Sequence, residues 1–338
     1  KLFEFAEFTT VESLWAAARS SYYPVEISSC LRTIVRSKLR YAVIGLPCVI
    51  KGIRRAQDRM PRLKENIPVL LGLACGQQRG KGFAEYLVRR AGQGMDSVRR
   101  ISFREKREGQ PATKSHFAVW TERSAFPYCV ERSDGYGLAW SRSYFKQDAC
   151  NYCDDVFAEV ADAAFMDAWL PGFREDPRGT SIVIARSRLC ADLLSDGARS
   201  GALSIVPIDI RDVIRSQQGC LHVKRDGAAL QLSLNENRPL EFHPRVQPAP
   251  KWCVTARYRK AAENRRMLAS RTVLAAQQAA GPGLQTFTAE IREITRRDSL
   301  VLKILAFLSL PRRAFRKAIR TAASLTLRFM HRSVHHLP

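Results

Sequence analysis

The sequence of 338 residues predicts an α/β fold with a mixed, largely parallel sheet, flanking helices and a basic helical C-terminal region. Two observations predict the sheet. Apolar runs rich in β-branched residues alternate with helical patterns, and these runs are apolar at nearly every position, as in strands buried on both faces. A third observation predicts the C-terminal region, because Ala, Arg and Leu dominate the chain from residue 252 onward.

The first two strand-helix units have the strongest patterns. Residues 41–47 (YAVIGLP) form an apolar run that ends at Gly and Pro, and residues 49–60 follow as a helix. Residues 67–75 (IPVLLGLAC) repeat the run, and residues 83–91 form a second helix after a glycine-rich turn. We therefore expect two parallel strands joined by a helical crossover.

The later elements are predicted from the same patterns. Strands are expected at 99–106, 115–122, 161–169, 180–187 and 202–209, a helix at 188–201, and a turn-rich segment with scattered aromatics at 123–149. The chain then divides into an α/β domain (1–237), a proline-rich linker (238–251) and the basic helical region (252–338).

Composition and charge limit the class of protein. With 46% hydrophobic and 26% charged residues, the chain has globular composition. Of the net charge of +23, +14 lies in residues 251–338, which hold 18 Lys and Arg against 4 Asp and Glu. Such a block can bind nucleic acid, an anionic membrane surface or an acidic partner, or it can be a solvated helical face.

The longest apolar run does not predict a membrane span. Residues 299–310 contain Lys303 and number 12, whereas a spanning helix needs about 20 apolar residues. Residues 311–330 carry an apolar stripe beside a basic face. The segment 299–330 is therefore expected either to pack on its own domain or to lie on an anionic membrane. The expected location is the cytoplasm, with peripheral binding to the inner membrane face as the further possibility.

The nine cysteines are odd in number and widely scattered, which argues against a secreted disulfide framework and favours a reducing cytosol. Cys48 and Cys75 each end a predicted buried strand, where open α/β sheets gather ligands. Cys150 and Cys153 form a Cys-x-x-Cys pair. If the two strands are neighbours, the four thiols can meet and hold a [4Fe–4S] cluster or zinc. Packing of Cys48 and Cys75 as small apolar side chains is the alternative.

Five segments occur in an order that resembles the coenzyme F420 hydrogenase/dehydrogenase beta subunit family. They are YAVIGLPCVIKGIRR, VLLGLACGQQRGKGFAEYL, ISFREKREG, CNYCDDVFAEVADAAFMDAW and DPRGTSIVIARSRLCADLL. The match runs from about residue 20 to residue 206. Bacterial members of this family include proteins encoded among surface-polysaccharide genes.

The resemblance implies an iron–sulfur flavoprotein that binds FAD and a [4Fe–4S] cluster, with Cys48, Cys75, Cys150 and Cys153 as cluster ligands. This sequence has Met166-Asp167 where family members usually have Gly-Asp, so backbone freedom at that turn is lost. The chain also begins with Lys1 and lacks the glycine-rich segment that usually precedes this region. We therefore expect a truncated N-terminus and partial or absent FAD binding.

Two basic segments are candidate flavin contacts. The turn GQQRGKG offers Gly76 and Gly80 for close backbone approach, and Arg79 and Lys81 for charge ahead of a helix N-terminus. It matches no standard dinucleotide motif and can equally be a solvated turn. The predicted strand 102–107 places its alternate residues on one basic face, which either binds an anionic cofactor or protects an edge strand: Ser102, Arg104 and Lys106.

The leading hypothesis is an oxidoreductase that passes electrons between the cluster, FAD and an unidentified organic substrate, with a redox partner protein or a reduced cofactor as electron donor. A role in surface polysaccharide biosynthesis is the expected setting. Catalytic side chains are not identified, because no histidine lies in a nucleophile motif. The alternatives are a zinc-stapled, basic nucleic-acid-binding protein and a non-redox accessory protein of polysaccharide assembly. Aromatic residues do not interleave with the basic ones, which argues against nucleic acid.

Overall fold

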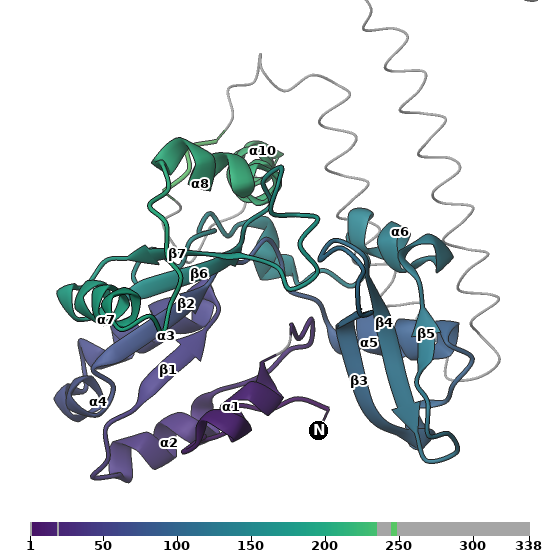
Figure 1. Ribbon diagram of the computed structural model, residues 1–338, viewed down its shortest axis with the longest axis horizontal. Helices are drawn as coiled ribbons and strands as arrows, with labels where there is room; N and C mark the ends of the chain where they lie inside the picture. Colours follow the sequence, from purple (N-terminus) through teal and green to yellow (C-terminus); the bar gives the residue numbers. More distant parts are fainter. Residues whose placement is uncertain (1, 19, 235–244, 249–338) are drawn as a thin grey trace, which may run out of the picture.

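The computed structural model describes residues 2–18, 20–234 and 245–248, and it contains two β-sheets (Figure 1). The larger sheet has four strands in the order β1-β2-β6-β7, and the smaller has three in the order β3-β4-β5. Two helices precede the sheets: α1 (Val11–Ala17) and α2 (Ser28–Arg36). The predicted fold class, a mixed and largely parallel sheet with flanking helices, is confirmed for this part of the chain.

The larger sheet is parallel except at one edge. Strands β1 (Ala42–Gly45), β2 (Val69–Leu73) and β6 (Ala163–Asp167) are parallel neighbours, and β7 (Ser181–Ala185) pairs antiparallel with β6. Between β1 and β2 the chain forms α3 (Pro47–Gln57) and α4 (Pro61–Asn66). The prediction that the first two strands are parallel and joined by a helical crossover is therefore confirmed.

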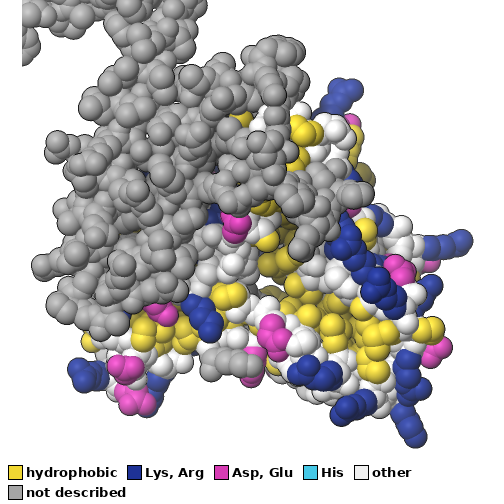
Figure 2. All heavy atoms as spheres, turned by 180° about the vertical axis from the view of Figure 1, so that it is seen from behind, with side chains coloured by type: hydrophobic (Ala, Val, Ile, Leu, Met, Phe, Trp, Pro, Cys, Tyr) yellow, Lys and Arg dark blue, Asp and Glu magenta, His cyan; other side chains and the backbone are white. Residues whose placement is uncertain are grey.

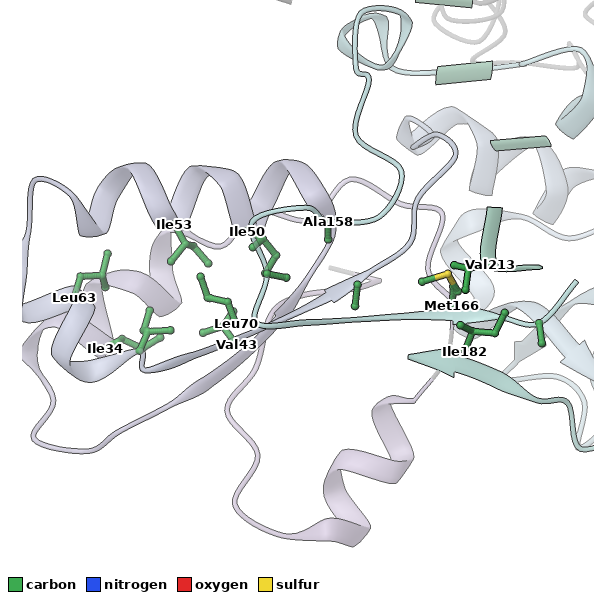
Figure 3. Close-up of a cluster of buried hydrophobic side chains, with 14 of the residues drawn as sticks. Ile34, Val43, Ile50, Ile53, Leu63, Leu70, Ala158, Met166, Ile182 and Val213 are labelled. Atoms are coloured by element: carbon green, nitrogen blue, oxygen red, sulfur yellow. The ribbon is translucent and has the colours of Figure 1, made fainter. Parts of the chain in front are cut away.

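The core of this sheet is aliphatic. Ile50 and Ile53 of α3 pack with Leu63 and Leu70, and all four are at most 1% exposed (Figure 3). The apolar face of α3 thus covers the sheet, as the alternation of strand and helix patterns requires.

A half-buried carboxylate helps to hold strand β6 beside β2. Asp162, just before β6, accepts a hydrogen bond from the Leu70 backbone N–H at 2.7 Å and one from Arg54 of α3 at 2.9 Å. Gly72 permits the close approach of the next turn, because a Cβ there would lie 2.2 Å from the Ala158 Cβ. Strand, helix and loop are therefore joined at the centre of the sheet.

A separate antiparallel unit occupies the chain between β2 and β6. It consists of α5 (Lys81–Arg90), a short 3₁₀ turn (Met95–Ser97), β3 (Val98–Lys106), β4 (Ser115–Thr121), β5 (Tyr128–Val130), a second 3₁₀ turn (Arg132–Asp134) and α6 (Tyr136–Ser141). The sequence predicts strands β3 and β4, but not that they leave the main sheet. The core of the unit is aromatic and includes Phe83, Phe103, Phe117, Tyr136 and Tyr144.

The strand predicted at 202–209 is wrong. These residues form an irregular connection between α7 (Arg188–Arg199) and α8 (Ile210–Ser216). Pro207 lies inside the run and has no N–H for a strand ladder. Leu203 instead packs against α7 beside Gly197, where an added Cβ would lie 2.6 Å from the Leu203 side chain. After α8 the chain continues as α9 (Gln218–Leu221), a π-helical turn (His222–Asp226) and α10 (Gly227–Leu234).

Hydrophobic side chains gather into a patch on the face turned away in Figure 1, with Lys and Arg around it (Figure 2). Exposed large apolar residues in the second half of the described chain include Leu189, Leu193, Val206, Ile210 and Ile214.

None of the helices that the structure describes has the length and apolar character of a membrane span. The predicted basic region 252–338 and its segment 299–330 lie outside the described residues, and the domain boundary at 237 stays a prediction.

Candidate functional site

The first two predicted cysteine ligands lie at the same edge of the main sheet. β1 and β2 are paired from Ala42 with Val69 to Gly45 with Gly72, so both strands end side by side. Cys48 is in the first turn of α3, three residues after β1, and Cys75 comes two residues after β2. The Cys75 backbone N–H donates to Val156 O at 3.0 Å, which ties this residue to the segment after the Cys-x-x-Cys pair.

The second pair of cysteines is carried by a short 3₁₀ turn, Asp148–Asn151, and the residues that follow it. The Cys150 sulfur accepts a hydrogen bond from the Gln78 backbone N–H at 3.3 Å. In the other direction, the Gln147 backbone N–H donates to Gln78 O at 3.0 Å. The turn after β2 and the Cys-x-x-Cys segment are therefore held together by backbone groups of both.

The four thiols are close enough to interact electrostatically. Burial, together with smaller effects of the neighbouring Cys150, Cys48 and Cys153, raises the pKa of Cys75 to about 12, although the Lys224 charge acts in the opposite direction. Burial likewise raises the pKa of Cys48, with Cys153 and Cys150 adding to the effect. Removal of a proton from any of these thiols thus places negative charge beside other sulfurs, and a cation is needed to gather all four as thiolates.

Lys224 is a residue of this site that the sequence does not predict. It lies in the π-helical turn, its side chain is 2% exposed, and its Nζ donates to the Cys153 sulfur at 3.0 Å and to Asp155 O at 2.7 Å. Burial alone would lower the pKa of Lys224, but the negative charge of Cys75 and Cys153 outweighs it, and the pKa is raised. No sequence pattern links a lysine of a late helix to a cysteine 71 residues earlier.

The two aspartates after the Cys-x-x-Cys pair have structural partners. Asp154 binds Arg245 through both oxygens, at 3.0 and 3.2 Å, and Arg245 also pairs with Glu159. Although burial raises the pKa of Asp154, the hydrogen bonds and charge of Arg245 lower it overall. The Asp155 carboxylate accepts from the Glu159 backbone N–H at 3.2 Å. Both carboxylates therefore fix the loop.

The four predicted ligands are all cysteine sulfurs, which are the usual donors to an iron–sulfur cluster. Among the described residues, no three His, Cys, Asp or Glu side chains are grouped for a single metal ion. In a cluster each thiolate binds a different iron, so the ligands stand farther apart than those of one ion. Four soft sulfur donors from three segments fit the chemistry of such a cluster.

The predicted flavin contacts in the turn after β2 differ in exposure, since Arg79 is buried and Lys81 is exposed. Arg79 is fully buried, and its guanidinium donates to Tyr144 O and Trp140 O, both at 2.7 Å. Gly80 is the N-cap of α5 and donates to Phe145 O at 2.7 Å, while Lys81 is exposed at the first position of this helix. Gly76 lies beside Cys220, whose sulfur would be 3.0 Å from an added Cβ.

The predicted basic face of β3 is interrupted. A register shift between Ser102 and Glu105 breaks the strand alternation, and the Ser102 side chain is buried. Arg104 instead forms an ion pair with Asp167 of β6 at 2.8 Å, and Lys106 donates to Arg178 O at 3.1 Å. These two side chains join the antiparallel unit to the main sheet. Asp167, which follows the Met166 that replaces the glycine usual in the family, is thus occupied by its ion pair with Arg104.

The raised thiol pKa predicts slow alkylation of the metal-free protein. At pH 8 the Cys75 thiol is protonated in the folded state, whereas an ordinary cysteine ionises near pH 8.5. The rate of Cys75 modification by iodoacetamide, followed by mass spectrometry, should therefore keep rising between about pH 8 and 10 in the folded protein. In urea it should level off above about pH 9. Identical pH profiles in the two states would contradict the environment described for Cys75.

Comparison with known proteins identifies one family. A family model that describes the C terminus of the coenzyme F420 hydrogenase/dehydrogenase beta subunit matches residues 38–211, slightly more than half of the chain. No curated protein matches the chain. One similar solved structure is a chain from the xenon-derivatised F420-reducing [NiFe] hydrogenase complex of Methanosarcina barkeri. It has 19% identity and a TM-score of 0.48, and the match covers 68% of this chain and 75% of that chain.

Proposed function

Since the chain belongs to the coenzyme F420 hydrogenase/dehydrogenase beta subunit family, whose members are subunits of oxidoreductases, we propose that it binds a [4Fe–4S] cluster through Cys48, Cys75, Cys150 and Cys153. We further propose that it binds FAD and passes electrons between the cluster, the flavin and an organic substrate. The observation that carries the cluster proposal is that backbone pairing and hydrogen bonds bring three segments with four thiols to one sheet edge, where the thiols influence one another.

The protein's own groups have defined tasks in this proposal. β1 and β2 deliver Cys48 and Cys75 to adjacent positions, and the backbone N–H of Gln78 holds Cys150. A bound cluster would supply one-electron chemistry, while a bound flavin would exchange one electron for two. The protein must therefore keep the thiolates in place and shield them from water. The partial burial of Cys75, Cys150 and Cys153 serves both needs, whereas Cys48 is exposed.

The proposals for the flavin and the substrate rest on different support. FAD is proposed from the resemblance of the five sequence segments, with Lys81 as the exposed basic group of the turn after β2. A substrate from surface polysaccharide synthesis is proposed from the resemblance alone. A redox protein or reduced cofactor would donate the electrons.

Anaerobic purification of the full chain, followed by iron, sulfide, zinc and flavin analysis, tests this function. We expect about four irons and four sulfides per chain, with brown absorbance that dithionite bleaches. Added FAD should bind with a measurable quenching of its fluorescence. Zinc without sulfide would contradict the cluster, and a cluster without any flavin binding would limit the proposal to electron transfer.

A further inference from the structure

The ammonium group of Lys224 is placed to act on the proposed cluster. It donates to the Cys153 sulfur at 3.0 Å, and a second bond to Asp155 O at 2.7 Å fixes its position. The side chain is 2% exposed, so water does not screen this charge as it screens a surface lysine. The Lys224 ammonium, held in place by Asp155 O, thus donates a charged hydrogen bond to one of the four proposed ligands, Cys153.

Other nearby donors and charges do not make the same contact. Arg225, the next residue in the π-helical turn, pairs with Glu159 at 3.2 Å and is exposed. The Cys150 sulfur accepts from a neutral backbone donor, the Gln78 N–H, at a longer distance of 3.3 Å. Hydrogen bonds with a charged donor are stronger than those between neutral groups. Lys224 therefore differs from both in combining a full charge, burial and direct contact with sulfur.

We propose that Lys224 is a positioning residue that raises the reduction potential of the cluster through its hydrogen bond to the Cys153 sulfur. This inference rests on the proposed function, since it requires that Cys153 is a cluster ligand. Hydrogen bonds to the sulfurs and burial are known to set the potentials of iron–sulfur centres. Reduction of a bound cluster would increase the negative charge on its cysteine sulfurs, and the Lys224 ammonium would stabilise that state more than the oxidised one.

A purely structural role of Lys224 predicts different behaviour. In that case the side chain only joins the π-helical turn to Asp155 O, and its loss would lower stability or cluster content without changing the potential. Both roles can be separated by variants that keep the charge, keep a neutral donor, or remove both. These are Lys224→Arg, Lys224→Gln and Lys224→Met, with Arg225→Gln as the matched loss of one positive charge from the same turn.

The experiment is a potentiometric titration of the full chain with its cluster, followed by visible absorbance and electron paramagnetic resonance. At the wild-type midpoint we expect the ratio of reduced to oxidised cluster to fall about tenfold in Lys224→Met, or about 59 mV for one electron. Lys224→Gln should fall between, Lys224→Arg should retain most of the wild-type ratio, and Arg225→Gln should not differ from wild type. Iron–sulfur stretching bands in resonance Raman spectra should shift in the same order.

Each outcome of the titration either supports or overturns the proposed effect of Lys224 on the reduction potential. If Lys224→Met holds no iron, the comparison of Lys224→Gln with the wild type replaces it. Equal potentials in the wild type and in every iron-loaded Lys224 variant would overturn the inference and leave the proposed function intact. A wild-type protein that holds no iron under anaerobic reconstitution would overturn both. If Arg225→Gln shifted the reduction potential as much as Lys224→Met, the inference about Lys224 would also be overturned. The effect would then come from net charge rather than from the hydrogen bond to the Cys153 sulfur.

Discussion

Replacing any one of Cys48, Cys75, Cys150 and Cys153 by Ser should remove most of the iron and sulfide from the anaerobically reconstituted protein. A serine hydroxyl is a much poorer iron ligand than a thiolate, and three remaining cysteines leave one iron exposed to solvent. Iron and sulfide per chain, with the visible absorbance of the cluster, measure the effect. We expect at least a severalfold loss for each of the four variants.

The matched control for this prediction is Cys190→Ser. Cys190 lies in α7, is 6% exposed and has no place among the four proposed ligands. Its replacement should leave the iron content near that of the wild type. Wild-type iron content in any of the four test variants would show that the corresponding sulfur is not a ligand. Equal losses in Cys190→Ser would show that the assay reports general instability.

Replacing Arg79 by Met should destabilise the whole protein. The buried guanidinium satisfies two backbone carbonyls, Tyr144 O and Trp140 O, and lies 4.5 Å from the centre of the Trp140 ring. Methionine would fill part of the volume but remove the guanidinium donor from both carbonyls, of which Trp140 O keeps the Ser143 backbone N–H at 3.2 Å. We expect a loss of about 3–5 kcal/mol in the free energy of unfolding, measured by urea denaturation.

Lys81→Met is the control, because Lys81 is exposed two residues later in the same turn. A surface change of this kind should alter stability by no more than about 0.5 kcal/mol. If Arg79→Met kept the wild-type stability and lost only flavin binding, Arg79 would be a cofactor ligand and its burial in the protein core would not explain its role. The two variants thus separate a structural arginine from a binding one.

The cysteine-bearing sheet edge could be predicted from the sequence because local signals specify it. Apolar β-branched runs that end in Gly, Pro or Cys define β1 and β2, and short helical crossovers make such strands parallel neighbours. Cys48 and Cys75 then reach the same edge whatever the remaining chain does. The family resemblance adds Cys150 and Cys153, whose approach depends on long-range packing that no local pattern contains.

Other features could not be predicted, for reasons that concern long-range contacts. β6 pairs directly with β2, and Asp162 accepts from the Leu70 backbone N–H, so β3 and β4 do not lie between these strands although they come between them in sequence. Arg79 and Lys224 are charged residues inside the protein, and their burial follows from partners far along the chain rather than from neighbours in sequence. The strand expected at 202–209 failed because an apolar run was given more weight than Pro207.

The insertion of the antiparallel unit between β2 and β6 determines when the site can be completed during synthesis. Cys48 and Cys75 leave the ribosome early, Cys150 and Cys153 only after the entire antiparallel unit, and Lys224 about 70 residues later still. A growing chain therefore presents at most half of the ligand set until most of its domain exists. If the chain holds the proposed cluster, delivery of that cluster would accordingly follow synthesis of the whole antiparallel unit.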